Sequence, residues 1–205
     1  MGHVVEDLVN CGFIKGLKVV LDSKPLEARA RCRRDPKNPS RGWFDSEARL
    51  GRGARGLIMG YKVHLACDGE EDMPLAFKVA PANENEKRHA IPLLSEAVEK
   101  VRAEAVICDK QYSSRKMREF VEALGAEQVI PYPANQQKGV KGVLRVDKKF
   151  RVHGPEKLRR LYRLRSSVER VNSRLEALLG KVTFKGLKAA AIQVSYAILG
   201  MLFVA

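Results

Sequence analysis

Two short apolar runs that each end on an aspartate constrain this chain more than any other feature. The first is Val19–Leu21 followed by Asp22, and the second is Val106–Cys108 followed by Asp109. Continuous apolar runs of this length are typical of strands buried on both faces of a sheet. An acid directly after such a strand lies at its carboxyl end, where open α/β sheets place their functional sites. The sequence therefore predicts an α/β fold with two aspartates at one edge of the sheet.

A helix predicted over residues 155–179 contributes a third acid, Glu169. Polar residues recur along it at steps of three and four and therefore share one face: Tyr162, Arg165, Glu169, Asn172 and Glu176. The neighbouring stripe is wholly apolar: Leu161, Leu164, Val168, Val171, Leu175 and Leu178. Burying this stripe against the sheet would hold Glu169 at the rim of the core, aimed along the sheet edge. The alternative is an ordinary amphipathic helix whose acid is solvated.

Three carboxylates at one sheet edge suit a hard divalent cation, because Mg²⁺ prefers oxygen ligands and keeps several waters. Two such ions can clamp the attacking and leaving oxygens of a phosphodiester displacement. We therefore predict that Asp22, Asp109 and Glu169 are the catalytic and metal-binding residues. Aspartates after strands also serve as turn residues or helix caps, which is the competing interpretation. Other acids near strand ends or turns are alternative members of the set: Asp45, Asp68 and Glu86.

The charge balance points to a polyanionic partner. The chain of 205 residues has 38 Lys and Arg against 24 Asp and Glu, a formal net charge of +14. Solubility does not require such an excess, and DNA or RNA is the usual reason for it. One cluster of basic residues is the predicted phosphate track: Lys138, Lys141, Lys148, Lys149 and Arg151. The alternatives are a solvated lysine loop and a merely basic globular protein.

The length suits one main domain. Residues 1–16 are predicted to hold a helix ahead of the core, residues 17–182 the core, and residues 183–205 an apolar helix packing on it. Two basic insertions are expected near 25–56 and 134–154. The final apolar segment is at the short edge of a membrane span, so a core helix and no membrane association are expected. The cysteines lack zinc-ligand spacing, which predicts reduced thiols in a cytoplasmic protein.

The motifs together resemble the catalytic part of an insertion-sequence transposase of the DDE class. Asp22, Asp109 and Glu169 match the triad in order and context, and the spacing from Tyr162 through Arg165 to Glu169 matches the signature around the third acid. Further matching segments are 61–65, 81–83 and 109–112. The resemblance runs from about Val4 to Ala205 and implies an RNase H-like fold, a mixed sheet flanked by helices. It also implies magnesium, replaceable by manganese, and double-stranded DNA as substrate.

In this family water first cleaves a transposon end, and the freed 3′-hydroxyl then attacks target DNA. The resemblance implies a homodimer on DNA at the nucleoid. Tyr162 and Arg165 are expected to contact DNA, with Asn172 in support. The alternatives are that Arg165 orients Glu169 or forms a surface ion pair, and that Tyr162 packs in the core. The sequence departs from the family at Glu176, where a lysine is usual; Arg174 and Lys181 are candidate substitutes. Little chain precedes Leu17 for a separate DNA-binding region, as in a truncated or split element. A catalytically silent DNA-binding remnant and a regulatory protein without nucleic acid are the competing hypotheses.

Overall fold

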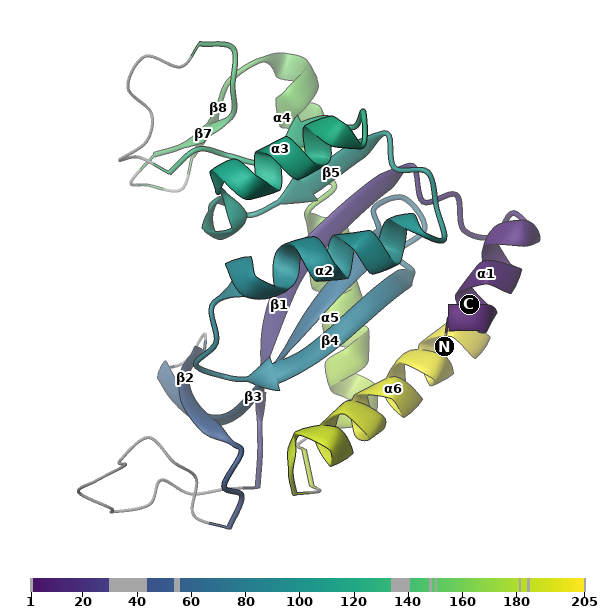
Figure 1. Ribbon diagram of the computed structural model, residues 1–205, viewed down its shortest axis with the longest axis vertical. Helices are drawn as coiled ribbons and strands as arrows, with labels where there is room; N and C mark the ends of the chain where they lie inside the picture. The colour runs from purple at the N-terminus through teal and green to yellow at the C-terminus, as the bar shows by residue number, and fades with distance from the viewer. Residues whose placement is uncertain are drawn as a thin grey trace.

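A mixed six-stranded sheet forms the centre of the computed structural model (Figure 1). The structure describes residues 2–29, 44–53, 56–133, 141–147, 149, 151–180, 182–183 and 185–204. The strands of the sheet are β1 (Lys18–Glu27), β2 (Arg49–Gly53), β3 (Gly56–Asp68), β4 (Pro74–Pro81), β5 (Ala105–Cys108) and β6 (Glu127–Val129). Their order is β2-β3-β1-β5-β6, and β4 also pairs with β3. The pairs β1–β5 and β5–β6 are parallel, whereas β3 pairs antiparallel with β1, β2 and β4.

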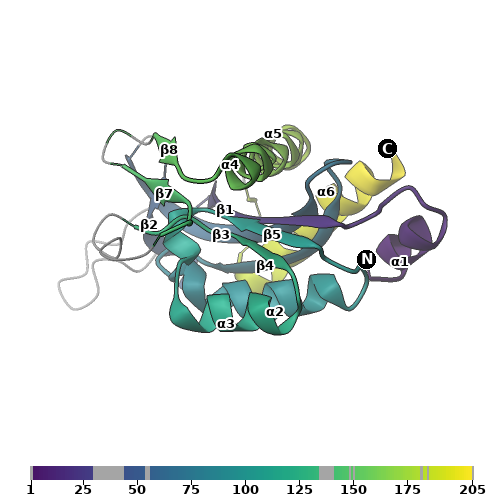
Figure 2. The same ribbon diagram turned by 90° about the horizontal axis from the view of Figure 1, so that it is seen from above.

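Helices cover both faces of this sheet. Figure 2 shows α2 and α3 on one face and α4 and α5 on the other. The helices are α1 (Gly2–Asn10), α2 (Glu86–Val98), the 3₁₀ helix η1 (Lys110–Tyr112), α3 (Arg115–Ala123), α4 (Glu156–Arg163), α5 (Ser166–Leu179) and α6 (Leu187–Phe203). Helix α6 packs against β4 and α5. No helix within the described ranges is long and apolar enough to cross a bilayer.

The parallel pairing of β1 with β5 sets the positions of the two aspartates. Leu21 lies opposite Cys108 at the end of this pairing, so Asp22 and Asp109 are the next residue on each strand. The expectation that the first strand stops at Asp22 is wrong, because β1 continues to Glu27 in register with β3. Asp22 therefore lies within a strand, at the point where its neighbour β5 ends. This places both aspartates at one level of the sheet.

The single long helix predicted over residues 155–179 is divided in two. The amide groups of Leu164, Arg165 and Ser167 bond to carbonyls three residues earlier, at 2.9–3.1 Å. Such bonds make a tighter 3₁₀ turn, which rotates α5 relative to α4. The predicted polar and apolar faces therefore do not run continuously through the joint. Leu178, expected to be buried, has 58% of its surface exposed.

Both segments predicted as basic insertions contain regular structure. The stretch 25–56 includes the end of β1 and all of β2. The stretch 134–154 includes a small antiparallel hairpin of β7 (Arg145–Val146) and β8 (Val152–His153). Strands β7 and β8 have two residues each, too few to show a period-two pattern, and they could not be predicted. Residues 30–43, 54–55, 134–140, 148 and 150 lie outside the described residues.

Candidate active site

Asp22 is an acid held in a largely apolar setting on the face of the sheet covered by α5. Only 22% of its side chain is exposed. Burial raises the pKa of its carboxyl to about 6, and the charges of Asp109 and Glu169 push in the same direction. The backbone N–H of Ser23 and the guanidinium of Arg165 act against this rise. The charges of Asp109 and Glu169 therefore both act on the carboxyl of Asp22.

Asp109 has a second, structural role at the end of β5. Its Oδ1 accepts a hydrogen bond of 2.5 Å from the backbone N–H of Lys110 and caps η1. The competing interpretation of a post-strand aspartate as a cap therefore applies to this residue. The cap also fixes the rotamer of Asp109 where β5 ends beside β1, so it orients the carboxylate as well as terminating the strand.

Arg165 joins the helix side of the site to the strand side. Its Nη2 donates a hydrogen bond of 2.5 Å to Oε1 of Glu169, and its Nη1 lies 3.8 Å from Oδ2 of Asp22. Burial opposes the charge of this guanidinium, but Tyr162 and the carboxylates of Asp22, Glu169 and Asp109 outweigh it and raise its pKa. Arg165 therefore contacts Asp22 on the strand side and Glu169 on the helix side, and the charge of Asp109 also acts on it.

The donor set has the chemistry of a site for a hard cation. Asp22, Asp109 and Glu169 supply three carboxylates against the one guanidinium of Arg165, which leaves net negative charge, and all the donors are oxygens. Within the described ranges no group of three or more His, Cys, Asp or Glu side chains stands ready to hold a metal ion. The carboxylate of Glu169 is hydrogen-bonded to Arg165 in this structure. The residues thus fit a divalent cation in type and charge, with Arg165 acting as the counter-ion.

The other residues predicted on this helix take different positions. Tyr162 is partly buried and packs against the core, and burial together with the charge of Asp109 raises its pKa to about 12. Asn172 is 6% exposed, and its Oδ1 has no hydrogen-bond partner among the described residues. Arg174 donates to the backbone carbonyl of Asp72, at the tip of the β3–β4 hairpin. Arg174 is therefore tied to a turn of the protein.

Glu176, which replaces the usual lysine, forms an ion pair with Lys24. Nζ of Lys24 lies 2.6 Å from Oε2 of Glu176. Lys24 follows Asp22 by two residues on β1, so both side chains lie on the same face of the strand. The site thus has a lysine beside α5, but the strand supplies it. A contact between residues separated by 152 positions leaves no local signal in the sequence.

The predicted phosphate track is only partly described. Lys138 and Lys148 lie outside the described residues, whereas Lys141, Lys149 and Arg151 are exposed. Oδ1 of Asp147 accepts hydrogen bonds of 2.8 Å from the backbone N–H groups of Lys149 and Arg151. Asp147 thus holds the backbone of Lys149 and Arg151, while the side chains of these two residues are exposed.

The three alternative acids have structural partners elsewhere. Asp45 accepts from the Tyr61 hydroxyl at 2.6 Å; burial opposes its ionisation, but this bond and backbone N–H donors lower its pKa. Asp68 accepts from the backbone N–H of Gly16 at 2.6 Å. Glu86 pairs with Lys62 at 2.6 Å, on the face of the sheet that α2 covers. None of these contacts involves Arg165 or the three predicted catalytic acids, Asp22, Asp109 and Glu169.

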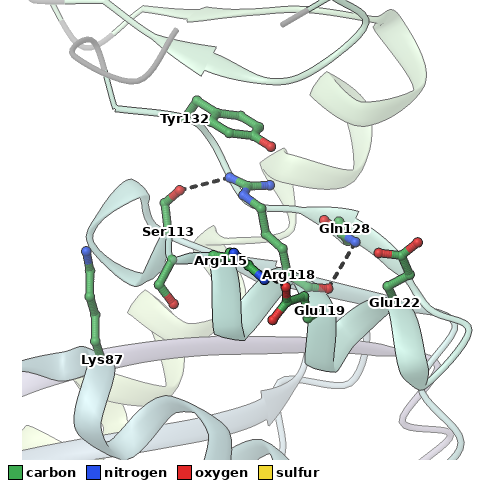
Figure 3. Close-up of a pocket in the computed structure, with 9 residues that line it drawn as sticks. Lys87, Ser113, Arg115, Arg118, Glu119, Glu122, Gln128 and Tyr132 are labelled. Carbon is green, nitrogen blue, oxygen red and sulfur yellow. Dashed lines mark hydrogen bonds and ion pairs between the residues drawn. The ribbon is translucent and has the colours of Figure 1, made fainter.

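One supporting residue that sequence reasoning missed is Arg118 on α3. Its Nη2 donates to Oγ of Ser113 and to the carbonyl of Ile130, both at 2.9 Å. Its guanidinium also lies 3.6 Å from the centre of the Tyr132 ring, an arrangement visible in Figure 3. Arg118 thus ties the segment after Asp109 to the chain beyond β6. An arginine within a helix rich in charged residues gives no sequence signal for such a role.

Comparison with a solved transposase structure supports this architecture. The piggyBac transposase, in a synaptic complex with hairpin DNA, matches with a TM-score of 0.53 and 12% identity, covering 92% of this chain and 47% of that one. The chain thus spans about half of that transposase, and at this identity the likeness shows the fold, which is RNase H-like. The catalytic core domain of BIV integrase gives a TM-score of 0.49 with 10% identity, covering 90% of this chain and 82% of that one.

Comparison with curated proteins gives no match. A family model described as "Transposase DDE domain" matches residues 15–202, which include β1, β5 and α5. This range contains Arg165 and all three predicted catalytic acids, Asp22, Asp109 and Glu169. By this match over most of its length, the chain belongs to the transposase DDE domain family and is a transposase catalytic domain.

Proposed function

We propose that Asp22, Asp109 and Glu169 are the three catalytic carboxylates of this transposase domain. The observation that carries the proposal has two parts: the parallel pairing of β1 with β5 brings Asp22 and Asp109 to one level of the sheet, and Arg165 contacts both Asp22 and Glu169. Two of the acids come from neighbouring strands and the third from a helix 60 or more positions away in the chain, so proximity in sequence does not explain the cluster. Proteins of this family depend on divalent metal ions. We propose magnesium, with manganese as a substitute, as the ion that these acids hold.

When bound, the cation would activate the attacking water or 3′-hydroxyl and stabilise the leaving oxygen. Asp22 would serve as an ionised ligand, and a nearby cation would overcome the effect of burial on its pKa. Asp109 would keep its orientation through the bond from Lys110. Arg165 would exchange Glu169 for a DNA phosphate, because guanidinium groups bind carboxylates and phosphates with similar geometry.

DNA is the proposed substrate, and its phosphates would follow basic side chains near the site. The net charge of +14 supports this. Arg165 and Tyr162 would contact the strand at the reacting phosphate, with Asn172 in support. Lys141, Lys149 and Arg151, together with Lys138 and Lys148, would form the remoter track. We propose domain boundaries at 1–16, 17–182 and 183–205, and a homodimer on DNA at the nucleoid, on the family resemblance.

A catalytically silent DNA-binding domain is the second candidate. The observation that favours it is the ion pair between Arg165 and Glu169, which engages a proposed metal ligand. The two candidates differ in what the acids do. In an active enzyme each acid is required for metal-dependent cleavage, whereas in a silent domain the acids affect folding alone.

A cleavage assay on supercoiled DNA with Mg²⁺ or Mn²⁺ tests the proposal. We expect nicking by the unmodified protein, and none by Asp22→Asn, Asp109→Asn or Glu169→Gln at equal folded concentration. Glu119→Gln is the matched control, because Glu119 forms a surface ion pair with Arg115 on α3. Nicking that persists in Asp109→Asn would contradict the assignment of the acids. Metal-independent DNA binding by the unmodified protein without nicking would favour the silent domain.

A further inference from the structure

The start of α5 has no side-chain cap, although this helix presents Glu169 in its first turn. Arg165 occupies the N-cap position in a helical conformation and makes no capping hydrogen bond through its side chain. The backbone enters α5 through the 3₁₀ turn described above. A tight turn within a helix is a common place for a hinge. Some other contact must therefore fix how α5 is rotated about this joint.

Apolar packing fixes only part of this geometry. Val168, Val171 and Leu175 are fully buried and hold α5 against the sheet. Burying this stripe sets the rotation of α5 coarsely, but hydrophobic burial is not directional and leaves the finer angle of the helix open. A hydrogen-bonded contact outside the sheet would set the rotation, because such contacts depend on angle.

Arg170, the residue after Glu169, makes such a contact. Its guanidinium binds both carboxylate oxygens of Asp72, with Nη2 lying 2.7 Å from Oδ1 and Nε donating to Oδ2. Its Nη1 lies 3.0 Å from Oγ of Ser166, and this hydroxyl donates to the carbonyl of Arg163 at 3.0 Å. The chain of bonds therefore runs from the β3–β4 turn, through α5, to the last residue of α4.

The turn that receives Arg170 is itself well anchored. Oδ1 of Asp68 accepts the backbone N–H of Glu70 at 2.8 Å, and Oδ2 accepts that of Gly16. Asp68 is fully buried, so these bonds are shielded from water. Arg174 adds a bond to the backbone carbonyl of Asp72. The hairpin tip is thus a fixed support for the helix.

We infer that Arg170 is a positioning residue for Glu169 and that Asp72 and Ser166 are its partners across the joint between α4 and α5. This inference rests on the proposed function, because Glu169 must hold the metal for its orientation to matter. A bidentate pair of arginine and carboxylate gives both direction and strength. Loss of the pair leaves only the bond from Arg174 at this support, so α5 can turn about the joint and shift Glu169 relative to Asp22 and Asp109. Residues that orient metal ligands typically change metal affinity by about ten- to a hundredfold.

Manganese binding by the full chain, followed by electron paramagnetic resonance without DNA, tests the inference. Arg170→Lys keeps the charge but cannot form the fork, and Asp72→Asn keeps the size of the side chain. We expect each to weaken Mn²⁺ binding about tenfold. Hydrogen exchange should also become faster across residues 163–170, without global unfolding. Arg115→Lys is the matched control, since Arg115 pairs with Glu119 on the exposed surface of α3 at 2.6 Å, and it should change neither quantity.

Unchanged Mn²⁺ affinity in both variants, or unchanged exchange at the joint, overturns the inference. If Arg170→Lys fails to fold, Asp72→Asn alone decides by the same two measurements. Glu169→Gln in the same series tests the proposed function separately. An unmodified protein that binds no Mn²⁺, or binds it as Glu169→Gln does, removes the metal site and this inference with it. Loss of binding in Glu169→Gln with full binding in both other variants removes only the role of Arg170.

Discussion

Asp22 and Asp109 are placed by two neighbouring strands, whereas Glu169 is placed by a helix that reaches the sheet from one face. The strand side is fixed by backbone pairing, with Leu21 opposite Cys108 and both fully buried. The helix side depends on side chains, and 55% of the Glu169 side chain is exposed. This difference indicates that one site combines a rigid half with an adjustable half. Changes to the two halves should therefore have different consequences.

The largest expected effect comes from altering the length of the carboxylate side chains. Asp109→Glu should reduce metal-dependent cleavage about a thousandfold or more, as removal of a catalytic group does. The capped and strand-held backbone cannot shift to accommodate an added methylene. Glu169→Asp should lose only about ten- to a hundredfold, because its side chain is more than half exposed and has room to adjust, as with a change to a supporting residue. Single-turnover nicking rates compare the two, and equal losses would contradict a rigid and an adjustable half.

Core packing should show the same contrast at the level of folding. Ile107 on β5 is fully buried, and Ile107→Ala should lower the free energy of unfolding by about 2–5 kcal/mol through the cavity it leaves. Leu178 on α5 is 58% exposed, so Leu178→Ala should stay within about 0.5 kcal/mol. Urea unfolding measures both values. A large loss of unfolding free energy for Leu178→Ala would show that Leu178 belongs to a buried apolar stripe, as the sequence predicts.

The strands that carry the site could be predicted from the sequence, whereas the break in the long helix could not. Apolar runs identified β1 and β5, and the parallel register then brings Asp22 and Asp109 to one level without further information. The joint between α4 and α5 could not be predicted, because Leu164 and Arg165 are good helix formers and no proline or glycine marks it. Its geometry depends on Asp72, which lies 98 positions before Arg170. Pairing between distant charged residues leaves no periodic pattern.

The pKa of Asp22 gives a third, smaller effect on the strand side. Burial raises it from its usual 3.8 to about 6, so the metal-free folded protein binds a proton that the unfolded chain releases. Stability should therefore fall as the pH rises from about 4 to 6 and then level off. Asp22→Asn removes this loss and should stabilise the metal-free protein by about 1–3 kcal/mol at pH 7.5. Unfolding in EDTA at several pH values measures this, and the gain should vanish near pH 3.

The smallest expected effect lies outside both halves, in the basic hairpin. Lys149 is exposed, and a contact with one phosphate changes the log–log salt slope of DNA binding by about 0.9. Lys149→Glu should lower the magnitude of this slope by at least that amount. Lys188→Glu on the exposed surface of α6 is the control with the same change in charge. Equal slopes for the two variants would show that the hairpin is not part of the phosphate track.

The location of a bound metal ion tests the central claim most directly. Crystals of the protein grown with Mn²⁺ would reveal the ion by its anomalous scattering, independently of any activity. We predict that the ion is coordinated by carboxylate oxygens of Asp22, Asp109 and Glu169, with the guanidinium of Arg165 displaced from Glu169. Manganese bound instead at Asp45, Asp68 or Glu86, or an intact bond between Arg165 and Glu169 beside a bound ion, would contradict this account.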